Sequence, residues 1–134
     1  MPTIFSKIIN GEIPCYRIAE NDEFLAFLDI SPLEKGHTLI VPKKEIDYIF
    51  DLEDDLLVNM HLFSKKVARA IQDSVPCIRI GVAVIGLEVP HAHIHLVPLH
   101  SLGSMTFTKE RINLSQAEFA EIAQSIRTKF EENI

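Results

Sequence analysis

The amino-acid sequence predicts an α+β fold, with an antiparallel sheet of about five strands, one long central helix and one C-terminal helix. Strand-like runs pair across short turns within residues 15–29 and 79–97, and short turns favour antiparallel pairing. Apolar residues recur at helical spacing in two longer segments. The chain has 134 residues, of which 47% are hydrophobic and 24% charged, so residues 1–134 are expected to form one domain.

The N-terminal part predicts a short helix followed by a hairpin. Thr3 can cap a helix over residues 3–9, and Gly11 can end it. Residues 15–19 and 24–29 have the composition of strands and are separated by a polar turn. These two runs are therefore expected to form the first hairpin of the sheet.

The middle of the chain predicts a third strand and the long helix. Residues 37–41 are rich in β-branched and apolar side chains, and Pro42 ends the run. Asp51 can cap a helix over residues 51–74, and Pro76 follows its end. One face of this helix is apolar and consists of Leu56, Met60, Phe63, Val67 and Ile71.

The C-terminal part predicts two further strands and the last helix. Residues 79–85 and 93–97 are largely apolar over the length of a strand. The segment that follows has no clear period and is expected to be a loop. A capping box of Ser115 and Glu118 then begins a helix over about residues 115–132.

Composition and charge narrow the classes of partner. The net charge of −6 argues against nucleic acid, whose phosphate backbone needs a basic face. Backbone amides or imidazolium groups can still hold a single phosphate. No apolar run reaches the length of a membrane span and no targeting segment is recognised, which favours a cytoplasmic protein that binds no membrane. Cys15 and Cys77 fit no metal-ligand spacing and are expected to be reduced thiols.

The most unusual feature of the chain is the alternation of His91, His93 and His95. Alternation is the period of a β-strand, so the three imidazoles would project from one face while apolar residues fill the other. Histidine can act as an acid, a base, a nucleophile or a metal ligand. This strand is therefore expected to form the floor of an active site.

Three interpretations of these histidines remain open. In a straight strand the outer pair lies about 13 Å apart, so three imidazoles cannot share one zinc ion. Two neighbours could bind a metal if His37 supplied a third ligand. The histidines could also be plain polar groups at a sheet edge. The third interpretation is nucleophilic attack on phosphorus by the central histidine, His93, oriented from both sides.

The run of residues 91–97 resembles the motif of the histidine-triad (HIT) family, which is His-x-His-x-His followed by two apolar residues. Residues 4–14 resemble the N-terminal segment of that family, and residues 27–32 and 36–44 resemble its middle block. The similarity extends over about residues 3–98 and excludes the C-terminal helix. It implies a single HIT-like domain whose sheet continues across a homodimer.

The resemblance also implies a reaction and its residues. Members of the family cleave nucleotides at the α-phosphate through a nucleotidyl-histidine intermediate. Carried over by position, His93 is the nucleophile, the carbonyl of His91 holds its other ring nitrogen, and His95 and His37 line the phosphate site.

The nucleoside contacts follow from the same resemblance. Asp29 matches the carboxylate that accepts the ribose hydroxyls. The apolar pocket for the base matches Ile4, Phe5, Ile8, Phe27, Leu28 and Ile30. Without the resemblance, Asp29 can equally be a turn cap, and the residues near the N-terminus can be ordinary core.

Two departures from the family pattern bear on the chemistry. Residues 81–89 lack the Asn and Gly-Gln/Ser/Thr donors, and Glu88 takes the place of the leaving-group donor. Glu88 would repel phosphate when ionised, could protonate an amine leaving group when neutral, or could be a plain surface acid. Thr3, Ser6 and Glu45 stand where some members bind structural zinc, so no such zinc is expected.

Taken together, these observations predict a hydrolase of purine nucleoside 5′-phosphoramidates or related nucleotidyl conjugates that uses neither cofactor nor metal. The nearest alternative is a dinucleoside polyphosphate hydrolase. A nucleotide-binding or interaction module with a weakened catalytic site is the alternative outside the enzymes, and metal-dependent hydrolysis is the third.

Overall fold

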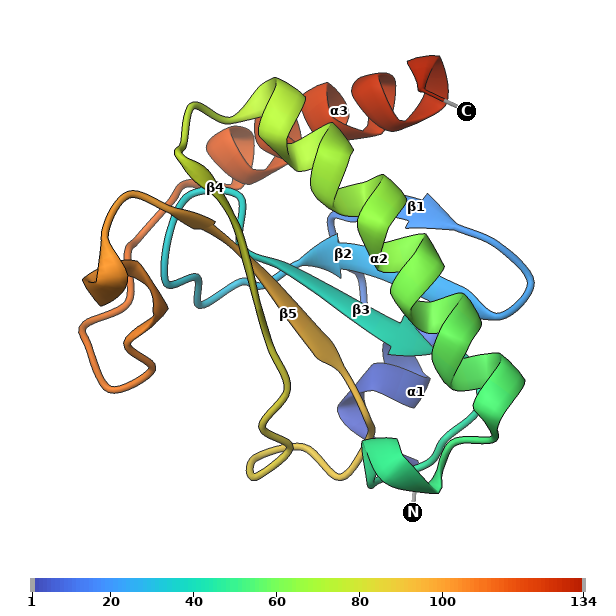
Figure 1. Ribbon diagram of the computed structural model, residues 1–134. Coiled ribbons are helices and arrows are strands. Elements are labelled where there is room, and N and C mark those ends of the chain that lie inside the picture. The colour runs from blue at the N-terminus through green and yellow to red at the C-terminus, as the bar shows by residue number, and fades with distance from the viewer. Residues whose placement is uncertain (1, 134) are drawn as a thin grey trace.

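The computed structural model describes residues 2–133 and confirms the predicted α+β architecture (Figure 1). Its strands form one antiparallel sheet of 5 strands in the order β1-β2-β3-β5-β4. In chain order the elements are α1 (Ile4–Ile9), β1 (Arg17–Glu20), β2 (Phe24–Leu28), β3 (Thr38–Pro42), the 3₁₀ turn η1 (Ile49–Asp51), α2 (Asp54–Ser74), β4 (Arg79–Ala83), β5 (Ile94–Leu99), the 3₁₀ turn η2 (Leu102–Met105) and α3 (Gln116–Glu132).

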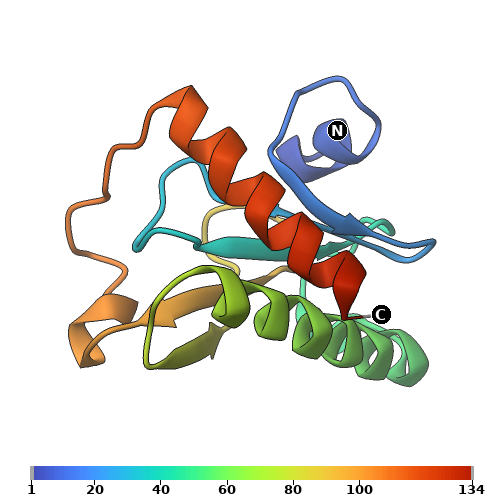
Figure 2. The same ribbon diagram turned by 90° about the horizontal axis from the view of Figure 1, so that it is seen from above.

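The two faces of the sheet are covered unequally. Along β2, Phe24, Ala26 and Leu28 pack in the larger core with α2 and α3, whereas Leu25 and Phe27 lie in a smaller cluster with residues of α1. Helices α1 and α2 lie on opposite sides of the sheet in Figure 2. Because α1 has only 6 residues, much of its face of the sheet remains free to form a site.

The register between β3 and β5 places a histidine on the α1 face. Leu39 pairs with His95, and Ile40 pairs with Ile94. Leu39 belongs to the cluster beside α1, and Ile40 to the larger core. His95 therefore points to the thinly covered side of the sheet.

The prediction that all three histidines lie within one strand is wrong. Strand β5 begins at Ile94, so His91 lies in a bend and His93 in the irregular stretch directly before the strand. On the neighbouring side, β4 ends at Ala83, which pairs with His95. Because the ladder stops there, the carbonyl group of His91 is free to accept a hydrogen bond from a side chain.

The long helix also begins later than predicted, at Asp54 rather than Asp51. Glu53 takes the N-cap position without a side-chain bond to the helix. Asp51 lies instead in η1, and both Ile49 and Leu52 on either side of it are buried. Burial of these two apolar side chains accounts for the extra turn before α2.

Several smaller expectations hold. The hydroxyl of Thr3 accepts a backbone amide of the first turn of α1 at 3.0 Å. Ser115 and Glu118 form a reciprocal capping box at the start of α3. Cys15 and Cys77 are free thiols. Within residues 2–133, no helix combines the length and apolar character needed to cross a membrane.

Candidate functional site

The histidine-bearing face of the sheet opens into a cavity of about 580 Å³. Its walls come from α1, the turn after β2, the segments on both sides of β5, and the stretch between η2 and α3. The side chains with a charge or a hydrogen-bonding group are Asp29, Ser31, Glu88, His93, His95, Thr108 and Arg111. Apolar contacts come from Ile4, Phe5, Leu39 and Phe107, among others. Carboxylates, imidazoles and a guanidinium therefore surround one space.

The ring of His93 is held by the backbone just before β5. Its Nδ1 lies 2.7 Å from the carbonyl oxygen of His91. A carbonyl only accepts, so Nδ1 carries the proton and Nε2 keeps its lone pair. Burial lowers the pKa of His93 despite the opposing effect of that carbonyl, so the ring is neutral at pH 7. A neutral imidazole with a free Nε2 can act as a nucleophile or a general base.

His91 is fully buried and connects three parts of the fold. Its Nε2 donates to the carbonyl oxygen of Pro42 at the end of β3, over 2.8 Å. Its Nδ1 must then accept, and the hydroxyl of Thr3 donates to it over 2.8 Å. Thr3 also caps α1, so the helix start, the end of β3 and the carbonyl that holds His93 form one rigid unit.

His37 and His95 form a second chain of hydrogen bonds that begins at the backbone. The amide of Leu33 donates to Nδ1 of His37 over 3.0 Å, so the proton of that ring is on Nε2. Nε2 of His37 then donates to Nδ1 of His95 over 3.0 Å. The remaining nitrogen of His95, Nε2, therefore carries a proton and is available as a donor to a ligand in the cavity.

Both members of this pair are uncharged at neutral pH. Burial, reinforced by the neighbouring His95 and Arg111, lowers the pKa of His37 to about 3. Burial, reinforced by His93 and Arg111, lowers the pKa of His95 to about 4. At neutral pH these two residues can therefore donate hydrogen bonds but carry no charge.

The structure brings together a possible set of metal ligands, but not the one that the metal interpretation required: it contains Asp29, His37 and only one histidine of the 91–95 run, His95. Ligand atoms of Asp29, His37 and His95 all lie within 4.8 Å of one another. However, the amide of Leu33 occupies Nδ1 of His37, which puts a proton on Nε2, the nitrogen that faces the other two groups. A metal could bind only after that bond was broken or the ring lost a second proton, so the donor set does not fit a metal in this arrangement.

The position of the family's structural zinc is filled by a hydrogen-bond network. The amide of Thr3 donates to Oε1 of Glu45 over 2.9 Å, and the hydroxyl of Ser6 donates to the same oxygen over 2.6 Å. The bond from Ser6 and the bond from Thr3 hold the pKa of Glu45 below its usual value. Hydroxyls and one carboxylate already paired with them do not fit a zinc ion, which in structural sites prefers thiolate and imidazole.

Asp29 lies at the end of β2 with one oxygen bound and one available. Oδ1 accepts the amide of Ser31 over 2.8 Å, so Asp29 does cap a turn. Oδ2 lies 3.7 Å from Nε2 of His37. Burial raises the pKa of Asp29, while the Ser31 amide and Arg111 act to lower it. A carboxylate in this position can accept hydrogen bonds from a ligand hydroxyl through Oδ2.

The apolar residues assigned to the base pocket are only partly brought together. Ile4 and Phe5 line the cavity, and the ring of Phe27 supports Phe5 with centroids 5.7 Å apart. Ile8 packs beside this cluster, and Ile30 is 72% exposed beyond the end of β2. The assignment of Leu28 to the pocket is wrong. Strand alternation turns its side chain into the larger core on the opposite face.

Sequence reasoning missed the wall formed by Phe107, Thr108 and Arg111. Phe107 meets the ring of His95 edge-on with centroids 4.8 Å apart. Nη1 of Arg111 donates to the carbonyl oxygen of Ser31. This wall lies in the segment without a period and beyond the recognised motifs, so only its basic and aromatic residues hinted at a role.

The remaining wall, residues 84–90, contrasts with the others. Glu88 reaches the cavity but is exposed, and Leu87 is 87% exposed. Gly86 adopts a left-handed conformation with φ of 75°, which turns the chain at this point. The structure thus places Glu88 beside the site without a protein partner that fixes its carboxylate among the hydrogen bonds and ion pairs of residues 2–133.

Known proteins share this fold and much of this sequence. A model of the HIT domain family matches residues 10–102. The adenosine 5′-monophosphoramidase of Schizosaccharomyces pombe is 36% identical over 99 residues, which cover 73% of this chain and 74% of that protein. A HIT-like protein of Borreliella burgdorferi is 34% identical over 131 residues, covering 92% and 94%. The crystal structure of a Hit-like protein from Bartonella henselae aligns with a TM-score of 0.82 at 30% identity over 95% of both chains.

Proposed function

The chain belongs to the HIT family, and on that premise we propose that it is a nucleotide-binding hydrolase that cleaves purine nucleoside 5′-phosphoramidates at the α-phosphate. The observation that carries the proposal is the state of His93. Its Nδ1 proton is held by the carbonyl of His91, and its Nε2 lone pair is left on the wall of a cavity large enough for a nucleotide. The related phosphoramidase of S. pombe supports the choice of a phosphorus–nitrogen bond.

The reaction follows from the tautomers. Nε2 of His93 attacks the α-phosphorus, the phosphorus–nitrogen bond breaks, and the amine leaves with a proton from solvent or a nearby acid. The ring becomes cationic in the nucleotidyl intermediate, and the His91 carbonyl that accepts its Nδ1 proton stabilises this charge. Nε2 of His95 donates a hydrogen bond to a non-bridging phosphate oxygen. Water then hydrolyses the intermediate to the nucleoside monophosphate and neutral His93.

The nucleoside would occupy the α1 side of the cavity. Oδ2 of Asp29 is available for the ribose hydroxyls because only Oδ1 is used by the turn. Ile4 and Phe5 supply apolar surface for a purine. With the nucleoside there, the α-phosphate would lie within reach of His93 and His95, which line the same cavity.

The proposal is tested by turnover and by trapping. Purified protein is mixed with adenosine 5′-phosphoramidate or with a diadenosine polyphosphate, and AMP release is measured. Wild type should favour the phosphoramidate, His93→Ala should lose at least about 10³-fold in rate, and His100→Ala, at an exposed histidine outside the cavity, should match wild type. Acid quenching should reveal a nucleotidyl adduct on His93 by mass spectrometry.

Each alternative predicts a different result. Equal AMP release by His93→Ala would rule out the nucleophile. Faster turnover of the diadenosine polyphosphate would favour the polyphosphate hydrolase. Tight AMP binding without turnover of either compound would favour a nucleotide-binding module.

We further propose a homodimer in which the sheet continues through β4. This strand is at the edge of the sheet, and its neighbourhood carries exposed apolar side chains, with Ile78 at 68%, Val82 at 58% and Leu102 at 99% exposure. A second copy could pair with this edge antiparallel. Val82→Asp should give a monomer by sedimentation, whereas Arg17→Asp on the opposite edge strand should not. A wild-type monomer would refute the dimer.

A further inference from the structure

The walls of the cavity carry more acidic than basic side chains, and the histidines add no positive charge at neutral pH. Two carboxylates, Asp29 and Glu88, lie on its walls. His37 and His95 are uncharged at neutral pH. Arg111 is the only lysine or arginine among the lining residues. An anionic ligand would therefore find one full positive charge in this cavity.

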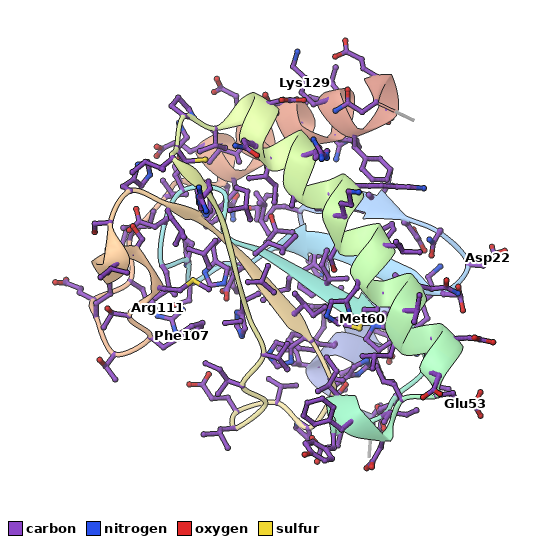
Figure 3. All side chains as sticks on the ribbon, in the orientation of Figure 1. Asp22, Glu53, Met60, Phe107, Arg111 and Lys129 are labelled. Carbon is purple, nitrogen blue, oxygen red and sulfur yellow. The ribbon has the colours of Figure 1, made fainter. Side chains whose placement is uncertain are left out.

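Arg111 is held beside the histidines by its surroundings. Nη1 donates to the carbonyl of Ser31, whose own amide binds Oδ1 of Asp29. Its guanidinium carbon lies 5.9 Å from the ring centroid of Phe107, and that ring packs on His95. Figure 3 labels Phe107 and Arg111 on the segment between β5 and α3. These contacts connect the guanidinium to both the carboxylate and the imidazole side of the site.

The charge of Arg111 is not neutralised by an ion pair with any residue of 2–133. Lys109, two residues earlier in the same segment, differs in this respect because its ammonium pairs with Glu34. A guanidinium has five N–H donors, and the Ser31 carbonyl uses only part of that capacity. The remaining donors are suited to the oxygens of a phosphate.

The same residue accounts for a gap found in the sequence. Residues 81–89 lack the Asn and Gln/Ser/Thr donors that the resemblance leads one to expect beside the phosphate. The wall formed by Phe107, Thr108 and Arg111 reaches the cavity from the opposite end of β5. Through Arg111, this wall can supply the hydrogen-bond donors for the phosphate that residues 81–89 lack.

We propose that Arg111 binds the α-phosphate oxygens of the nucleotide and is a substrate-binding residue of the site, held in position by Ser31 and Phe107. This inference rests on the proposed function, because it assumes that a nucleotide occupies the cavity. Arg111 would neutralise the phosphate charge, while His95 donates a neutral hydrogen bond to it.

Calorimetry with AMP and adenosine separates this role from a structural one. Wild type, Arg111→Met and Lys109→Met are titrated with each ligand. A lost hydrogen bond to a charged group is worth about 1.5–3 kcal/mol, so Arg111→Met should bind AMP about 10- to 100-fold more weakly. Its affinity for adenosine, which has no phosphate, should stay within about twofold of wild type, and Arg111→Lys should recover part of the AMP affinity. Lys109→Met should resemble wild type with both ligands.

The possible results separate a failure of the role of Arg111 from a failure of the proposed function. If wild type binds no AMP, the proposed function fails. If wild type binds AMP and Arg111→Met binds it equally well, the role of Arg111 fails alone. Equal losses for AMP and adenosine would mean that Arg111 only supports the fold. A loss seen with ADP but not with AMP would move its contact beyond the α-phosphate and overturn the assignment.

Discussion

Two neighbouring parts of the chain border the same cavity and are built in opposite ways. In residues 91–95 the histidines are at most 9% exposed, and their protein-facing nitrogens have partners. In residues 84–90 the chain turns at Gly86, Leu87 is 87% exposed, and Glu88 lies at the surface. The first region fixes the tautomers of its imidazoles. In the second, no hydrogen bond or ion pair among residues 2–133 fixes the Glu88 carboxylate.

This contrast shows how a protein fixes the tautomer of an imidazole. Backbone amides and carbonyls cannot exchange the roles of donor and acceptor. Leu33, Pro42 and the carbonyl of His91 therefore decide the tautomer of each ring they contact. A carboxyl group, in contrast, only accepts when ionised but can also donate when protonated. Variants that remove one partner at a time can break or sharpen this comparison.

The largest effect is expected from His37. It accepts a hydrogen bond from the Leu33 amide and donates one to His95, which fixes the tautomer of His95. His37→Leu removes the donor to Nδ1 of His95, so the second ring can adopt either tautomer. Because His37 acts only through the orientation and tautomer of His95, kcat/KM should fall about 10- to 100-fold. His37→Gln, whose amide can still donate, should retain more activity. If steady-state kinetics gave the same kcat/KM for His37→Leu and wild type, this role of His37 would be contradicted.

The next effect concerns Thr3, which holds His91 and caps α1. Thr3→Val leaves Nδ1 of His91 as a buried acceptor without a donor and removes the cap. The free energy of unfolding should fall by about 1–3 kcal/mol, and kcat should fall about three- to tenfold as the His91 carbonyl shifts. Thr3→Ser keeps the hydroxyl and serves as the control. Denaturation curves and kcat that do not distinguish Val from Ser would refute this link.

The buried neutral histidines predict a loss of stability in acid. The pKa values of His37 and His95 are about 3 and about 4 in the folded chain, against an ordinary 6.5, so the unfolded chain binds more protons in this interval. The free energy of unfolding should be level above pH 6.5 and fall between pH 6.5 and about 4. Asp29, whose pKa burial raises, opposes part of this loss. Urea titrations at several pH values test it, and a flat profile would contradict the neutral pair.

The smallest effect is expected at Glu88, in the open region. Glu88→Gln should change AMP release from a phosphoramidate with an aromatic amine leaving group by less than about threefold, because no hydrogen bond or ion pair from residues 2–133 orients this carboxylate. Glu110→Gln, at another exposed acid, is the control. A fall of about 100-fold or more, greatest with alkylamine leaving groups, would make Glu88 the general acid and remove the contrast between the two regions.

Some residues of the site could be predicted from local spacing and from the family motif. Alternation identified His91, His93 and His95, and the family resemblance added Asp29 and His37. Asp29, His93 and His95 line the cavity, His37 is bonded to His95, and His91 holds the ring of His93 through its carbonyl. Leu28 was misassigned because a matched motif does not state which residues of a strand face the site. Arg111 was missed because an irregular segment carries no period that would predict its direction.

The sequence by itself determined the α+β class, the antiparallel hairpins, the caps at Thr3 and Ser115, and the chemistry-bearing histidines. Each of these depends on residues a few positions apart. Tertiary structure alone decided the tautomers of His91 and His95 and the Arg111 wall, whereas His93 and His37 are fixed by backbone groups only two and four residues away. The tautomers of His91 and His95 and the wall arise from contacts across large separations, 58 positions for His37 and His95, 88 for Thr3 and His91, and 80 for Arg111 and Ser31. Local spacing cannot encode such meetings, because they exist only once strand register and loop packing have brought the partners within hydrogen-bond distance.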